Sequence, residues 1–171
     1  MTKPLVISST LLNRATSGHA PTQFKLAQMY MESEHEDDNA LAEEWALKAA
    51  INGHVEAMYW LGEGYVVYAK ELAEEDPEES KTYFEHAHHW LKQASDENHP
   101  AAILELAGFY RRGDVVEKDV EQSIKLVKQA AELGEVQAMR DLACIYEHGL
   151  GIDIDLEQAD FWINKADNTK A

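Results

Sequence analysis

The sequence has few positive charges. Its 15 Lys and Arg residues stand against 32 Asp and Glu residues, which gives a formal net charge of −17 at pH 7 and a pI near 4.7. Such a surface repels phosphate backbones and anionic lipid headgroups, so nucleic acid and membranes are excluded as primary ligands. The charge allows a protein or peptide partner, including a basic one.

Cysteine and long apolar runs are also scarce. The one cysteine, Cys144, cannot form an internal disulfide, and its apolar surroundings (LACIY) favour a small buried hydrophobic residue. No apolar stretch approaches the roughly 20 residues that a membrane span needs. Ser8, Ser9 and Thr10 interrupt the apolar run near the start, unlike a secretory leader. We therefore expect a reducing, cytoplasmic setting.

Known catalytic motifs are missing as well. The sequence has no G-x-S-x-G, no H-E-x-x-H and no carboxylate pair in an apolar setting that would raise a pKa. It therefore predicts a protein that is not an enzyme.

What the sequence does contain is a repeat. A segment with Leu, then Ala or Gly, then Tyr three residues further on occurs as GHAPTQFKLAQMY (18–30), GHVEAMYWLGEGY (53–65), NHPAAILELAGFY (98–110) and GEVQAMRDLACIY (134–146). A second element follows each copy, anchored by Trp45, Trp90, Leu126 and Trp162, which are 45, 36 and 36 residues apart. A period near 36 residues is typical of a solenoid of helix–turn–helix units.

Residue types at the expected helix ends and contacts support this interpretation. Asp76, Asp119 and Asp155 each precede a helix-forming run that they are suited to cap, and Pro77 suits a first helical position. The small residue after each repeat Leu is expected to face the partner helix, because antiparallel helices approach closely only at such positions. These residues are Ala27, Gly62, Ala107 and Ala143.

The fourth copy resembles the Sel-one-like repeat (SLR), a tetratricopeptide-related module. The matching residues are Tyr146, Gly149, Gly151, Ile152, Asp155, Ala159, Trp162, Lys165 and Ala166. The resemblance implies an all-α fold: a right-handed α-solenoid of about four SLR/TPR-like repeats at 18–52, 53–97, 98–133 and 134–167, within a repeat domain of residues 18–171. Residues 1–17 are expected to form an N-terminal capping segment with one helix.

Two segments raise the question of a ligand site. Gly149 and Gly151 precede several carboxylates, but a phosphate loop needs a preceding strand and a Lys-Ser/Thr pair, and a calcium loop needs a D-x-D-x-D-G order. We expect a turn with positive φ angles there, followed by a cap at Asp155.

The segment HAHHW supplies His86, His88 and His89, and an i, i+3 pair of histidines binds a metal only weakly without a third ligand. His19, His54 and His99 share one repeat position, which indicates a role in the turn. We therefore expect no metal and no cofactor.

The resemblance to tetratricopeptide-type solenoids implies that the first helix of each repeat lines a concave groove. The residues two before and two after each repeat Leu would point into it: Phe24, Gln28, Tyr59, Glu63, Leu104, Gly108, Arg140 and Cys144. Phe24, Tyr59 and Leu104 would form an apolar strip of binding anchors. The alternative is that these three residues pack against neighbouring helices.

The second repeat carries nine extra residues, within YVVYAKELAEEDPEES (65–80). We expect its first helix to run about two turns longer, up to Asp76 and Pro77. A candidate acidic binding surface follows, with the alternative of an ordinary solvated face. Its residues are Glu71, Glu74, Glu75 and Asp76 of the insertion, together with Glu36, Asp37 and Asp38.

These features predict a non-enzymatic bacterial scaffold or adaptor that binds a protein or peptide on its groove and acidic surface. One alternative is an acidic immunity protein that neutralises a basic toxin. A further alternative is a metal-binding accessory protein or hydrolase that uses the histidines. Phe161, Trp162 and Ile163 of the last helix would allow a homo-oligomer through the C-terminal repeat.

Overall fold

The structure, a computed structural model, describes residues 5–33 and 38–169. This part of the chain forms nine α-helices and no strand. The helices are α1 (Ser9–Thr16), α2 (Ala20–Met31), α3 (Asp38–Ile51), α4 (Val55–Leu72), α5 (Pro77–Asp96), α6 (Pro100–Arg112), α7 (Val120–Glu132), α8 (Val136–His148) and α9 (Leu156–Asn168). None of these helices is both long and apolar enough to cross a membrane.

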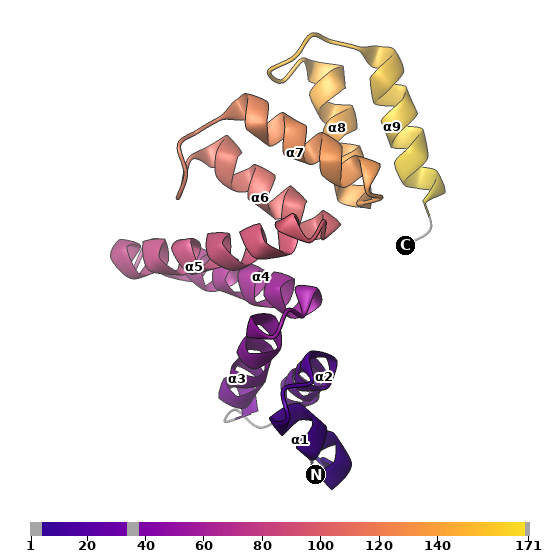
Figure 1. The fold of residues 1–171 in the computed structure, drawn as a ribbon. Helices are drawn as coiled ribbons and strands as arrows, with labels where there is room; N and C mark the ends of the chain where they lie inside the picture. Colours follow the sequence, from indigo (N-terminus) through magenta and orange to yellow (C-terminus); the bar gives the residue numbers. More distant parts are fainter. Residues whose placement is uncertain (1–4, 34–37, 170–171) are drawn as a thin grey trace.

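The helices stack as four pairs, which confirms the predicted α-solenoid. The pairs are α2–α3, α4–α5, α6–α7 and α8–α9, and the second helix of each pair packs against the first helix of the next. The first and last pairs lie at opposite ends of the stack (Figure 1). At the N-terminal end α1 packs on α2, where the side-chain amide of Gln23 donates a 2.9 Å hydrogen bond to the carbonyl oxygen of Ala15.

Small residues set how closely the two helices of a pair approach. Ala27, Gly62, Ala107 and Ala143 are all buried, as predicted. At Gly62 of α4 an added Cβ would lie 2.6 Å from Cγ of Leu91 on α5. Leu91 is itself fully buried, and its backbone nitrogen lies 3.3 Å from the same added Cβ, so a shift of the side chain alone would still leave a tight contact.

The buried residues form two clusters that meet at α6. The first cluster runs from Phe24 to Phe109, and the second from Ile103 to Ala166. Within α6, Ala102 and Phe109 belong to the first cluster, whereas Ile103, Leu106 and Ala107 belong to the second. Helix α6 therefore forms one wall of each core.

The helix starts are those predicted from the aspartates. Side-chain oxygens of Asp76, Asp119 and Asp155 accept hydrogen bonds of 2.9–3.0 Å from the backbone N–H groups three residues later. Pro77 and Pro100 are the first residues of α5 and α6. Each cap satisfies a backbone donor that the first turn of a helix leaves free.

The glycine- and aspartate-rich segment of the fourth repeat is a turn, as expected. Gly149 has φ 65° and ends α8, and Gly151 has φ 84°. The N–H of Asp155 then donates to the carbonyl oxygen of Tyr146 at 3.0 Å, and the third repeat has the same bond from Asp119 to Tyr110 at 2.9 Å. The aspartates that resembled a ligand loop thus shape the chain between two helices.

The nine extra residues of the second repeat lengthen both of its helices. The predicted extension of α4 is confirmed, whereas the extension of α5 was not predicted. Helix α4 has 18 residues against 13 in α6, and α5 has 20 against 13 in α7. The ring of Tyr83 lies 6.0 Å from Tyr65 and 5.8 Å from Tyr68. These contacts pair the additional turns of α4 with those of α5, which reach beyond the neighbouring pairs (Figure 1).

Histidines cap three of the four first helices. His19, His54 and His99 precede α2, α4 and α6, and a ring nitrogen of each accepts from the backbone N–H three residues later at 3.2–3.3 Å. This confirms the predicted role in the turn. A nitrogen that accepts a hydrogen bond must be unprotonated, and burial lowers the pKa of His54, although the Glu56 carboxylate opposes the shift.

The close approach at Gly62 predicts an unequal pair of glycine substitutions. Gly62→Ala should lower the free energy of unfolding by about 1–3 kcal/mol, because the methyl group meets the buried Leu91 side chain and its backbone nitrogen. Gly64→Ala is the matched control on the same helix, since nothing lies within 4 Å of its added Cβ. It should raise stability by up to about 1 kcal/mol through helix propensity. Urea denaturation measures both, and equal effects would contradict the packing argument.

The histidine cap of α4 predicts a pH-dependent stability. Because the pKa of His54 is lower in the folded chain, the unfolded chain takes up the proton first as the pH falls below about 7. The free energy of unfolding should therefore decrease between pH 7.5 and 5. His54→Asn keeps a capping side chain without the titration and should show a smaller decrease; parallel curves for the two proteins would rule out this contribution.

Candidate functional site

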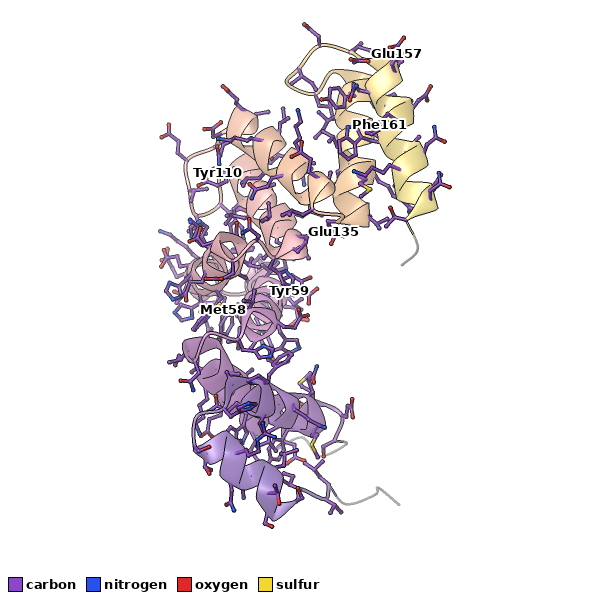
Figure 2. All side chains as sticks on the ribbon, turned by 45° about the vertical axis from the view of Figure 1, so that its right-hand side comes forward. Met58, Tyr59, Tyr110, Glu135, Glu157 and Phe161 are labelled. Atoms are coloured by element: carbon purple, nitrogen blue, oxygen red, sulfur yellow. The ribbon has the colours of Figure 1, made fainter. Side chains whose placement is uncertain are left out.

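The first helices of three successive repeats bring carboxylates to one place, around the ring of Tyr59 on α4. Burial, followed by the carboxylates of Glu63, Glu105 and Glu135, raises the pKa of the Tyr59 hydroxyl above its ordinary value. Figure 2 shows Tyr59 and Glu135 toward the same side of the bowed stack, with Tyr110 on the other side. We call Tyr59, Glu63, His99, Glu105 and Glu135 the Tyr59 cluster.

His99 holds the ring of Tyr59 in place. The two rings stack with centroids 4.5 Å apart and an interplanar angle of 21°. Nδ1 of His99 accepts from the N–H of Ala102, so Nε2 carries the proton and donates to a carboxylate oxygen of Glu56 at 3.1 Å. With both nitrogens engaged, His99 gives Tyr59 a fixed surface to pack on.

The remaining predicted groove residues fall into three groups. Gln28, Glu63, Arg140 and Cys144 are exposed, and Tyr59, Leu104 and Gly108 are half-buried. Arg140 lies 3.6 Å from an Asp167 carboxylate oxygen. Phe24 is only 6% exposed, because its ring packs on His54 with centroids 4.7 Å apart.

The predicted strip of Phe24, Tyr59 and Leu104 is therefore not a continuous exposed surface. Phe24 packs within the stack, as the alternative interpretation predicted. Leu104 packs against the second core cluster. Cys144 corrects a second expectation, since it is exposed rather than buried. It lies two residues after the buried Leu142, and helix geometry turns side chains at that spacing to the opposite side.

The predicted acidic surface is accessible where the structure describes it. Glu71, Glu74, Glu75 and Asp76 are exposed at the extended ends of α4 and α5, although Asp76 is engaged as the cap of α5. Asp38, the first residue of α3, is half-buried. Glu36 and Asp37 lie outside the described residues.

A pocket of about 340 Å³ opens where the end of α2, the start of α3 and the second half of α4 meet. Its aromatic lining comes from Trp60, Tyr65 and Tyr68, and its carboxylates from Glu43, Glu63 and Glu71. We call it the Trp60 pocket.

Sequence reasoning missed the Trp60 pocket. The sequence patterns place Glu63 in the groove and Glu71 on the acidic surface, but they place Trp60 on neither surface. The available signal was the extra length of α4, which carries Tyr65, Tyr68 and Glu71 alongside the preceding repeat.

The histidines of α5 point in different directions. His86 is exposed and contacts the rings of Tyr65 and Tyr83. His88 faces Phe109 with ring centroids 5.6 Å apart, and burial lowers its pKa. His89 is exposed beside Trp90. Across residues 5–33 and 38–169, no three His, Cys, Asp or Glu side chains are grouped so that they could hold a metal ion.

The last helix has exposed apolar residues. Phe161 is 54% and Ile163 38% exposed, whereas Trp162 is buried. Lys165 lies over the Trp162 ring at 4.6 Å from its centroid. Of the three residues predicted to allow self-association, two are therefore at the surface.

Comparison with solved structures identifies similar folds. The chain aligns over 97% of its length with c5321, a protective antigen of uropathogenic Escherichia coli displaying an SLR fold, at 27% identity and a TM-score of 0.78. It aligns over 94% of its length with a Sel1 repeat protein from Oxalobacter formigenes, at 24% identity and a TM-score of 0.76. The chain spans 34% and 62% of these two proteins, respectively.

The search of curated proteins gives no match. The family model for the Sel1 repeat matches four times, at residues 20–54, 55–99, 100–135 and 136–166. Sel1 repeat proteins generally mediate protein–protein interactions and are typically non-enzymatic. These matches cover most of the chain and agree with its four helix pairs, so the chain belongs to the Sel1 repeat family.

Proposed function

We propose that this protein is a non-enzymatic interaction module that binds a protein or peptide on the concave side of its stack, at the Tyr59 cluster. The observation that carries the proposal is the stack of Tyr59 of α4 on His99, the cap of α6, beside the charges of Glu63, Glu105 and Glu135 from α4, α6 and the cap of α8. The general role of Sel1 repeat proteins in protein–protein interaction supports a protein partner.

The Tyr59 cluster has the chemistry of a binding anchor. Tyr59 is half-buried and stacked on His99, so little side-chain entropy remains to be lost when a partner covers it. Tyrosines in such settings often contribute a large share of binding energy. The charges of Glu63, Glu105 and Glu135 act on the Tyr59 hydroxyl, and this negative charge favours a basic partner surface.

The acidic surface supports the same type of partner. Glu71, Glu74 and Glu75 form no ion pair with another described residue, and the whole chain has a formal net charge of −17. Uncompensated charge of one sign accelerates association with an oppositely charged protein. We propose a cytoplasmic adaptor that recognises a basic protein through these two surfaces.

A second candidate function, supported by the same uncompensated charge, is that of an immunity protein. The partner would then be a basic toxin, held by charge complementarity over a broad surface. The two functions differ in which surface dominates: an adaptor depends on the Tyr59 cluster, whereas a charge-based inhibitor depends also on Glu71, Glu74 and Glu75.

The Tyr59 cluster can be tested once a partner has been isolated by affinity capture and identified. Tyr59→Ala should weaken binding of the purified partner at least about tenfold, which corresponds to roughly 1.4 kcal/mol. Glu63→Lys, a change at an exposed position, should weaken binding without loss of the His99 stack. Glu85→Lys, an equal charge change at an exposed position of α5, is the control.

Calorimetric titration measures these affinities, and circular dichroism checks that each variant keeps its helices. Full affinity in both Tyr59→Ala and Glu63→Lys would show that the partner binds elsewhere.

Charge complementarity predicts a salt-dependent association rate. Raising the ionic strength shortens the screening length from about 30 Å at 0.01 M to about 8 Å at 0.15 M. The association rate constant with the partner should therefore fall by at least about tenfold over this range, as measured by stopped-flow fluorescence. A rate that stays constant would argue against a basic partner and against the immunity function.

A further inference from the structure

We propose that the Trp60 pocket binds the side chain of an arginine from the partner. This inference rests on the proposed function, because it assumes a protein partner on the adjacent Tyr59 cluster. The net negative charge of the chain favours any basic residue, whereas the inference names arginine for this pocket.

The pocket has the size and lining of a side-chain site. Its volume of about 340 Å³ is near the lower end of the range for ligand pockets, about 300–1,000 Å³. Met31, Val67 and Tyr68 line it while remaining 46%, 48% and 51% exposed. Gly64 also lines it and has open space where a side chain would begin. An inserted side chain can therefore contact apolar walls without moving the helices.

The carboxylates of the pocket have no cation of their own. Glu43, Glu63 and Glu71 form no ion pair with any Lys or Arg in the described part of the chain, and no Lys or Arg lines the pocket. The hydroxyl of Tyr65 donates to a carboxylate oxygen of Glu43 at 2.8 Å. This bond orients Glu43 and leaves its charge uncompensated.

Two of the other three tryptophans, Trp45 and Trp162, have an internal lysine over the ring from three residues later, whereas the residue at that spacing from Trp90 is Gln93. Lys48 lies over Trp45 at 4.3 Å from the ring centroid, and Lys165 lies over Trp162 at 4.6 Å. At Trp60 the residue three positions later is Glu63. Trp60 thus has a carboxylate at the position that supplies the cation to Trp45 and Trp162, and a cation from another molecule would meet both the ring and the carboxylate in the pocket.

Arginine fits this combination better than lysine. Its guanidinium group is planar, weakly hydrated and able to stack on aromatic faces while it donates to carboxylates on its edge. The rings of Trp60, Tyr65 and Tyr68 supply faces, and Glu43, Glu63 and Glu71 supply acceptors. A neutral side chain would cover the same carboxylates without pairing them, at a cost in desolvation.

The pocket is continuous with the Tyr59 cluster through Glu63. The same side chain lines the pocket, and its charge raises the pKa of the Tyr59 hydroxyl. Tyr59 and Trp60 are also neighbours on α4. A partner segment that covers Tyr59 therefore lies within reach of the pocket with one side chain.

The test uses the full chain with ¹⁵N-labelled tryptophan and a small probe in place of the partner. Nα-acetyl-arginine amide, added at millimolar concentrations, should shift the Trp60 indole N–H resonance saturably, with the peak assigned by Trp60→Phe. Nα-acetyl-citrulline amide, nearly equal in shape but uncharged, should bind at least about tenfold more weakly, because it lacks the charge that pairs with the carboxylates. Nα-acetyl-lysine amide should also bind more weakly than the arginine probe.

Two variants locate the site. Gly64→Leu places a side chain in the open space of the pocket, favours the helix over glycine, and should abolish the shift. Glu71→Gln should weaken binding about threefold or more through loss of one charge-assisted contact. Glu85→Gln, an equal change at an exposed position away from the pocket lining, should leave the affinity unchanged.

The outcomes separate this inference from the proposed function. No saturable shift at Trp60, or equal binding of the arginine and citrulline probes, overturns the inference. Equal binding of the lysine probe overturns the assignment to arginine. Partner binding that is lost in Tyr59→Ala but unchanged in Gly64→Leu overturns the pocket alone, whereas partner binding unaffected by Tyr59→Ala and Glu63→Lys overturns the proposed function.

Discussion

The close approach of paired helices at small residues is the interaction on which the rest of the structure depends. Gly62 lets α4 lie against the buried side chain of Leu91, and Ala27, Ala107 and Ala143 are buried at the same repeat position. Each pair thus uses a small residue at the same position of its first helix. The first helices consequently present equivalent positions to the same side of the stack.

That regularity accounts for the composition of the candidate site. Tyr59 and Glu63 are one turn apart on α4, Glu105 follows on α6, and His99 and Glu135 occupy equivalent capping positions. None of these residues is unusual in isolation. Their proximity results from stacking, and the insertion in the second repeat then adds the Trp60 pocket beside them.

Local signals in the sequence were sufficient for the helices, caps and turns. Asp76, Asp119 and Asp155 were recognised because a cap bonds to a backbone group only three residues away. The exposure of the groove residues was less predictable: Phe24 is covered by His54 from the next repeat. The Trp60 pocket is lined by α2 and α3 of the first repeat and by the lengthened α4 of the second, so no single repeat contains it.

Helix α6 contributes to both buried clusters, and this has a consequence for cooperativity. In solenoids, stability propagates between nearest neighbours, so the amino- and carboxyl-terminal halves can influence each other only across this shared helix. The Tyr59 cluster spans the same junction, from α4 through α6 to the start of α8. A bound partner would therefore contact both halves of the stack, and unfolding of one half would become more strongly coupled to unfolding of the other.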